Sequence, residues 1–287
     1  MLNFEISKST NLNIPGLKRA QALLNSVRQK DYGEEDLRKF YQSQKLTIET
    51  IESVAKILRP GMSEVDAASL LEESFYSIGV NKFLHRPFAW FGKRTTFFDM
   101  KTYADTLPRG NVILDENDCF ILDAAPYINK YPSDVGLGFS IGTETDDIKF
   151  VNKCIDEIEK EVISIFRNSK NTKEVYQYMS HLLEEKKLDN IHSKYPFGVL
   201  AHRLHPNSFQ GLPSFLKPFS LQAYLDILSR GFLEETIRGE RNASMSGIWA
   251  IEPHIGYNSY GTKFEKILVV QGDEIYWLHE KFENINS

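Results

Sequence analysis

The chain has 287 residues, of which 41% are hydrophobic and 25% are charged, and its formal net charge is −5 at pH 7. This composition is ordinary for a soluble globular protein, and the length suffices for a sizeable core in one large domain or two modest ones. The lysines and arginines are scattered along the chain, which argues against a nucleic-acid partner.

Two further features bear on where the protein acts. Cys119 and Cys154 are too few for a disulfide framework, and they suit a reducing compartment. No apolar run approaches the roughly 18 residues of a membrane-spanning helix, and the N-terminus lacks a signal-peptide pattern. We therefore expect a cytoplasmic protein without a membrane partner.

Apolar residues at helical spacing predict most of the helices. The predicted ranges are approximately 15–30, 34–58, 63–78, 146–165, 172–183 and 221–230. The segment from Ser63 to Asp66 has the form of a capping box, which marks the start of the third helix. We expect residues 1–34 to form a lead-in with one helix, and residues 35–287 to form the main domain.

The first of two predicted hairpins carries a pair of aspartates. An apolar strand leads from Cys119 to Asp123, and a two-residue loop at 128–129 returns the chain through Asp134. This loop would place Asp123 directly opposite Asp134, where facing Cβ atoms lie about 4.5–5.5 Å apart. Two carboxylates this close in apolar surroundings repel unless one is protonated or a cation lies between them.

The second predicted hairpin repeats this arrangement with glutamates. A loop at 258–259 would place Glu252 opposite Glu265, and apolar residues flank both acids. Acids are rarely buried unless they are paired or bound to metal. Four acids on two hairpins, with a histidine between them in the sequence, predict a site for two divalent ions such as Mn, Fe, Co or Zn. Two ions about 3.5–4 Å apart can activate a bridging water and polarise a substrate oxygen.

Four segments of the chain resemble one known family. The segments are LDAAPYINKYPSD, AHRLH, GIWAIEPHI and KFEKILVV, and they resemble the pita-bread metallohydrolases, which include methionine aminopeptidase, Xaa-Pro aminopeptidase, prolidase and creatinase. The resemblance covers about residues 35–280. It implies an α+β fold with a curved, mainly antiparallel six-stranded sheet backed by helices in two similar halves. It also implies a homodimer that acts on a small peptide or an amino-acid-like substrate.

The same resemblance implies five metal ligands in the order Asp, Asp, His, Glu and Glu. Carried over to the matching positions, they are Asp123, Asp134, His202, Glu252 and Glu265.

The third ligand departs from the family pattern. The family's metal histidine normally precedes a glycine by three residues, and His202 has no such glycine. An alternative register uses Gly198, which makes Tyr195 the ligand position and His202 a later, substrate-facing histidine. We favour His202, because tyrosine is a poor replacement and His202 follows an apolar strand.

Other positions also differ from the family pattern. Peptidases of the family carry a further histidine shortly before the first aspartate; the segment 100–110 has none, and His85 is the only upstream candidate. Lys266 stands where many members have an acid. We expect His192 to be an ordinary surface histidine.

The leading functional hypothesis is a two-metal hydrolase that cleaves a small peptide or amide. In this hypothesis Glu252 is a proton shuttle as well as a ligand, and His205 or His254 stabilises the tetrahedral intermediate. The alternative keeps the metals for non-peptidase chemistry: C–N hydrolysis, a lyase step or iron-dependent oxygen chemistry. A second alternative is a binding module of the same fold that lacks catalysis. The four acids argue against that module, because opposed buried carboxylates serve no purpose in it without metal.

Overall fold

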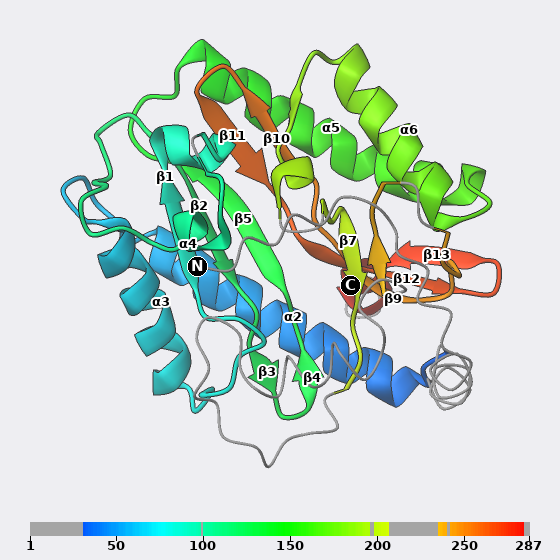
Figure 1. Cartoon of the computed structure of the whole chain (residues 1–287). Coiled ribbons are helices and arrows are strands. Elements are labelled where there is room, and N and C mark those ends of the chain that lie inside the picture. Colours follow the sequence, from blue (N-terminus) through cyan, green and yellow to red (C-terminus); the bar gives the residue numbers. More distant parts are fainter. Residues whose placement is uncertain (1–30, 99, 196–197, 207–234, 240–241, 284–287) are drawn as a thin grey trace, which may run out of the picture.

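The computed structural model describes residues 31–98, 100–195, 198–206, 235–239 and 242–283 (Figure 1). The predicted helices at 15–30 and 221–230 lie outside these residues, as does most of the predicted lead-in.

The helices of the described residues are α2 (Glu34–Ala55), α3 (Glu64–Ser77), α4 (Tyr103–Thr106), α5 (Asp146–Asn168), α6 (Thr172–Glu185) and α8 (Leu278–Glu283), with short 3₁₀ helices η1 (Gly92–Thr96) and η2 (His192–Lys194). Among them, α2, α3, α5 and α6 occupy predicted regions, whereas the short helices α4, α8, η1 and η2 were not predicted. The predicted capping box is confirmed, because Ser63 Oγ accepts a hydrogen bond from the Asp66 backbone and Ser63 N–H donates to the Asp66 carboxylate. Among the described helices, none has the length and apolar character that crossing a membrane requires.

The strands pair only in antiparallel fashion among the described residues. They are β1 (Phe88–Phe91), β2 (Cys119–Ala124), β3 (Tyr127–Ile128), β4 (Tyr131–Pro132), β5 (Val135–Ser140), β6 (Asp189–Asn190), β7 (Ala201–Arg203), β8 (Thr236–Ile237), β9 (Gly247–Ile251), β10 (His254–Tyr257), β11 (Tyr260–Lys263), β12 (Lys266–Gln271) and β13 (Glu274–Trp277). Their ladders have the orders β1-β2-β5, β13-β12-β9-β7-β8, β11-β10-β6 and β3-β4. The α+β, mainly antiparallel prediction is confirmed, whereas this pairing does not confirm the number of six strands.

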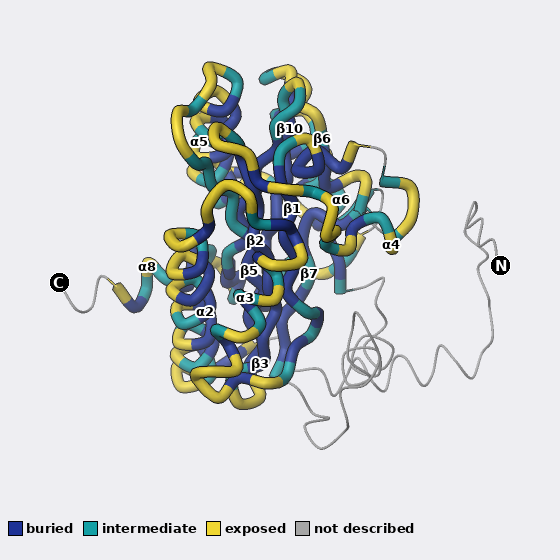
Figure 2. Tube along the Cα trace, turned by 90° about the vertical axis from the view of Figure 1, so that its left-hand side faces the viewer, coloured by how far each residue is buried: buried dark blue, intermediate teal, exposed yellow. Residues whose placement is uncertain are grey.

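Helices cover the strands in two groups. Apolar residues of α2 and α3, such as Val54 and Leu71, pack with Phe120 and Leu122 of β2. Apolar residues of α5 and α6 pack in the same way against β9 and β12 around Trp249. In Figures 1 and 2, α2 and α5 lie along one side of the strands, and the strand residues form the buried interior.

The predicted register of the first hairpin is wrong. Asp123 pairs with Gly136, and the short β3-β4 ladder pairs Ile128 with Tyr131, so the loop lies at 129–130. Asn129 adopts a φ of 57° in this loop, a left-handed conformation that asparagine tolerates better than most residues. The error is a shift of two residues along the return strand. Because side chains alternate faces, such a shift leaves both aspartates on the same face.

The predicted register of the second hairpin is confirmed. Tyr257 pairs with Tyr260, as the loop at 258–259 requires. The β9-β12 ladder continues the same register, with Ile251 opposite Lys266. Glu252 and Glu265 lie between these two ladders and face each other in that register.

Candidate metal centre

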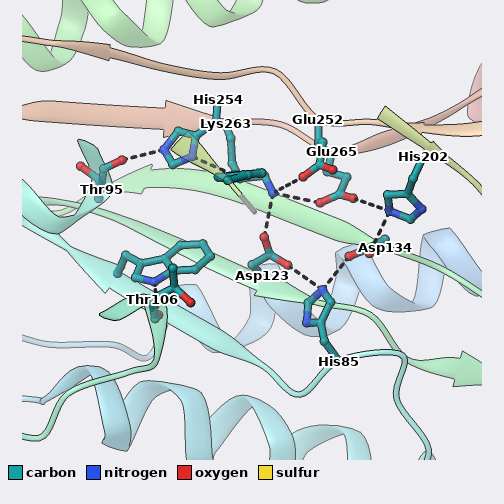
Figure 3. Close-up of polar contacts among 12 residues, drawn as sticks. His85, Thr95, Thr106, Asp123, Asp134, His202, Glu252, His254, Lys263 and Glu265 are labelled. Atoms are coloured by element: carbon teal, nitrogen blue, oxygen red, sulfur yellow. Dashed lines mark hydrogen bonds and ion pairs between the residues drawn. The ribbon is translucent and has the colours of Figure 1, made fainter. Parts of the chain in front are cut away.

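Four buried acids, one from each arm of the two hairpins, gather at the centre of the sheets (Figure 3). Asp123 lies on β2 and Asp134 immediately before β5, whereas Glu252 follows β9 and Glu265 precedes β12. Each acid is at most 8% exposed. Because carboxylates are costly to bury unless they are paired, their partners define the site.

Asp134 lies between two imidazoles. Its Oδ1 is 3.1 Å from His85 Nε2, and its Oδ2 is 3.1 Å from His202 Nε2. His85 Nδ1 also faces a backbone carbonyl, that of Arg86, at 2.9 Å. Since both nitrogens of His85 face acceptors, this ring carries both protons. Burial opposes its charge, but Asp134 and Asp123 raise the pKa of His85 to about 9.

His202 is held in the same way from the other side. Burial again opposes the charge, and Asp134 and Glu265 raise the pKa of His202 well above its ordinary value. Burial also acts against the ionised form of Asp134, yet the two imidazoles lower its pKa. Asp134 is therefore a carboxylate that two cationic rings stabilise.

A lysine holds the other three acids together. Lys263 Nζ lies 2.7 Å from Asp123 Oδ2, 3.0 Å from Glu265 Oε2 and 3.5 Å from Glu252 Oε2. The Lys263 side chain is 1% exposed. Burial opposes its charge, but the carboxylates, Asp123 foremost, raise the pKa of Lys263 well above its ordinary value. The ammonium is thus a permanent cation inside the cluster.

Two of the acids retain protons more readily than usual. Burial and the neighbouring Glu265 raise the pKa of Glu252 to about 8, and Lys263 only partly offsets this. Burial likewise raises the pKa of Asp123 to about 6 against the opposing charge of Lys263. At neutral pH in the metal-free protein, Glu252 therefore keeps its proton.

Two buried carboxylate oxygens indicate where a cation would bind. Asp123 Oδ1 and Glu265 Oε1 accept no hydrogen bond from the described residues. In two groups the ligand atoms lie within 4.8 Å of one another: His85 with Asp123 and Asp134, and Asp134 with His202 and Glu265. Carboxylate oxygens and imidazole nitrogens together suit divalent ions such as Mn, Fe or Zn. The residues present therefore fit a divalent ion beside Asp134.

The other predicted site residues lie in different contacts. His254 Nε2 donates to the carbonyl of Thr95 at 2.6 Å, so its Nδ1 accepts from the hydroxyl of Tyr195 at 2.8 Å. Burial lowers the pKa of His254 well below its ordinary value, in agreement with a neutral ring. His205 contacts the Tyr32 hydroxyl and the Glu235 carboxylate, each at 2.7 Å.

The structure bears on three further histidine and tyrosine positions. His202 is placed among the acids, whereas the hydroxyl of Tyr195, the alternative ligand position, is placed on His254. The expectation for His192 is wrong. Its ring is fully buried against Tyr176, and burial lowers the pKa of His192 to about 3.

Sequence reasoning did not place two members of the cluster among the acids: Lys263 was not considered, and His85 was named only as the upstream candidate for the family's further histidine. His85 is 38 positions before Asp123, and it reaches the site because β1 pairs with β2 with Phe88 opposite Asp123. Lys263 precedes Glu265 by two residues, which is the spacing of side chains on one face of a strand. That alternation was the available signal for Lys263; nothing local marks His85.

A model of metallopeptidase family M24 matches residues 38–271. Among curated proteins, no sequence matches the chain.

Solved structures share the fold at low sequence identity. The X-Pro aminopeptidase from Thermotoga maritima has a TM-score of 0.66 at 16% identity, over 91% of this chain and 64% of that one. A prolidase from Pyrococcus furiosus has a TM-score of 0.64 at 14% identity, over 90% of this chain and 67% of that one. The chain thus spans a little under two thirds of the Thermotoga protein.

Proposed function

Because the chain belongs to metallopeptidase family M24, we propose that it is a metal-dependent hydrolase that cleaves a small peptide or amide. The observation that carries this proposal is the group formed by Asp134, His202 and Glu265, whose ligand atoms lie within 4.8 Å of one another. The proposal also agrees with the similarity to prolidases and aminopeptidases, which at 13–16% identity shows the fold.

A divalent ion bound to these residues would polarise the substrate carbonyl and lower the pKa of a water molecule. Asp134 and His202 would be ligands through the atoms that now contact each other. Glu265 would add its Oε1, which accepts no hydrogen bond from the described residues. Protons leave the imidazole when an ion binds, so occupancy depends on pH.

Glu252 is the proposed proton shuttle. Its carboxyl lies beside the ligand group, and its pKa of about 8 lets it exchange a proton near neutral pH. His254 would be a positioning residue that orients Tyr195, since both of its ring nitrogens are already hydrogen-bonded. His205 would act in the same way through its contacts with Tyr32 and Glu235.

The finer sequence-based hypotheses remain predictions. They include two ions held by all five carried-over residues, a homodimer, a cytoplasmic location and a catalytic domain over 35–287. The number of ions depends on whether the Lys263 ammonium, which contacts Asp123 and both glutamates, leaves room for a second ion.

Metal content and turnover, measured together, test the proposal. We expect divalent metal in protein purified without chelator, and hydrolysis within a panel of peptides that begin with Met or with Xaa-Pro. Asp134→Ala should lose both, whereas Lys45→Ala, at a surface position on α2, should lose neither. Bound metal without turnover of any peptide would contradict peptide cleavage and favour the non-peptidase alternative. Absence of metal would contradict the whole proposal.

A further inference from the structure

Lys263 lies where part of a two-ion cluster would have to be. Its ammonium contacts one oxygen from each of three carboxylates that the family resemblance assigns as ligands: Asp123, Glu252 and Glu265. In Figure 3 its nitrogen lies at the centre of these three side chains, with His85 and His202 on the far side of the cluster.

An ammonium and a divalent ion held by the same oxygens would repel each other at close range. A lysine ammonium has three N–H donors and no lone pair, and three carboxylates take all three donors here. An ion bonded to Asp123 Oδ2 would lie about 2.0–2.2 Å from that oxygen. Lys263 Nζ lies 2.7 Å from the same oxygen, so the two cations would be at most about 5 Å apart in buried surroundings, where their repulsion is strong.

The fold provides space for this lysine. Strand β5 has a glycine at 136, where an added Cβ would lie 2.5 Å from Lys263 Cε and 2.7 Å from Lys263 Nζ. A residue of any other type would therefore collide with the end of the lysine side chain. The ammonium is positioned by the packing of β11 against β5.

The oxygens that Lys263 leaves free face the remaining ligands. Asp123 and Glu265 each contact Lys263 through one oxygen, and their other oxygens, Asp123 Oδ1 and Glu265 Oε1, are the buried atoms without a hydrogen bond from the described residues. His85 Nε2 lies 3.5 Å from Asp123 Oδ1, and His202 Nε2 lies 3.7 Å from Glu265 Oε1. The cluster is therefore divided into a side with a built-in cation and a side with open ligand atoms.

We propose that this centre takes one divalent ion, bound by Asp134, His202 and Glu265, and that Lys263 holds the position of the second. The inference rests on the proposed function in that it assumes a metal centre, but it departs from the sequence-based expectation of two ions. With three protein ligands, the single ion keeps open positions for water and substrate.

Counting bound Mn²⁺ tests the inference. The full chain is stripped with chelator, titrated with Mn²⁺ by calorimetry and, after desalting, assayed for manganese per chain. We expect one equivalent in the unmodified protein and a six-line paramagnetic resonance signal of isolated Mn²⁺. Lys263→Met removes the charge at similar length, so we expect it to admit a second equivalent. Two ions about 3.5–4 Å apart would then couple magnetically and broaden the signal.

Lys266→Met is the matched control, because Lys266 lies three residues further on and pairs with Glu159 of α5 instead of the cluster. It should bind one equivalent. Two equivalents in the unmodified protein would overturn the inference, and so would none. If Lys263→Met does not fold, the count and the resonance signal of the unmodified protein still decide. One equivalent without peptide turnover would leave the inference standing while the proposed peptidase function fails.

Discussion

The two acidic hairpins differ in the cations that they meet. In the first hairpin, both oxygens of Asp134 face imidazoles, those of His85 and His202. In the second hairpin, Glu252 and Glu265 face the ammonium of Lys263, which lies on the same hairpin. An imidazole can lose its proton and offer a lone pair to a metal, whereas an ammonium held charged cannot. We therefore expect equal numbers of carboxylates in the two hairpins to give unequal capacity for metal.

The largest expected effect lies in the first hairpin. Asp134→Asn leaves two buried imidazoles without their carboxylate, and removal of one partner of a buried ion pair costs about 3–5 kcal/mol. We expect metal binding to be lost and the free energy of unfolding of metal-free protein to fall by about 3 kcal/mol at pH 7, measured by urea denaturation. An unchanged midpoint in urea would contradict the central role of Asp134.

The corresponding change in the second hairpin should affect rate instead of stability. Glu252 keeps its proton below about pH 8, so Glu252→Gln replaces one neutral group by another. We expect kcat for a cleaved peptide to fall about 10²–10⁴-fold, as for loss of a general acid or base, with manganese content unchanged. Loss of the metal together with the rate would show instead that Glu252 is a ligand.

The stability of metal-free protein should fall as pH rises. His85 has a pKa of about 9 in the folded protein and an ordinary value of 6.5, so its stabilisation is full below pH 6.5 and is lost through pH 9. Glu252 also makes stability fall as pH rises, between pH 4.5 and about 8, because the folded state holds its proton more tightly than the unfolded state does. Urea denaturation at pH 6 to 9 should show a decrease on the order of 5 kcal/mol.

Two variants separate these contributions to the pH dependence. His85→Gln should make the decrease shallower from pH 6.5 to 9, whereas Glu252→Gln should make it shallower only below pH 8. A decrease of equal steepness in both variants and in the unmodified protein would rule out the two groups as its source.

The smallest expected effect comes from the space beside Lys263. Gly136→Ala forces the end of the lysine away from its position, and overpacking typically costs about 1–3 kcal/mol. Because the flexible end of Lys263 can move, we expect the low end of that range in unfolding free energy, together with altered manganese binding. Gly138→Ala is the control: its Cβ would meet Thr262 instead, so it should destabilise without a change in manganese binding.

The local patterns predicted most of the fold. Apolar periodicity and the capping box at Ser63 placed the four long helices, α2, α3, α5 and α6, within a few residues, because those signals act over one or two turns. The short helices α4 and α8 carry too few turns for such a pattern and were not predicted. The register of the second hairpin followed from its loop at 258–259. The first hairpin differed by two residues, because Asn129 tolerates the left-handed conformation and moves the loop by one position. A choice among adjacent loops is poorly specified by sequence alone.

The candidate site was only partly predictable. Acids at matching places in two hairpins could be recognised in the sequence, since alternation fixes which face each occupies. His85 could be named as an upstream candidate but not placed, because its approach to Asp134 depends on the pairing of β1 with β2 across a long segment. Lys263 had the correct alternation, but alternation does not show that a lysine side chain is buried among acids instead of exposed at the surface.

The lysine also bears on the order in which this protein is made. A newly synthesised chain that had to bury four carboxylates would otherwise need a metal before it could fold, as metal-dependent small domains do. Lys263 is a counter-ion attached to the chain, present at a fixed ratio and beyond the reach of any chelator. We therefore expect the chain to fold first and to acquire its ion afterwards, so that metal supply would set the active fraction of the protein and not the amount of folded protein.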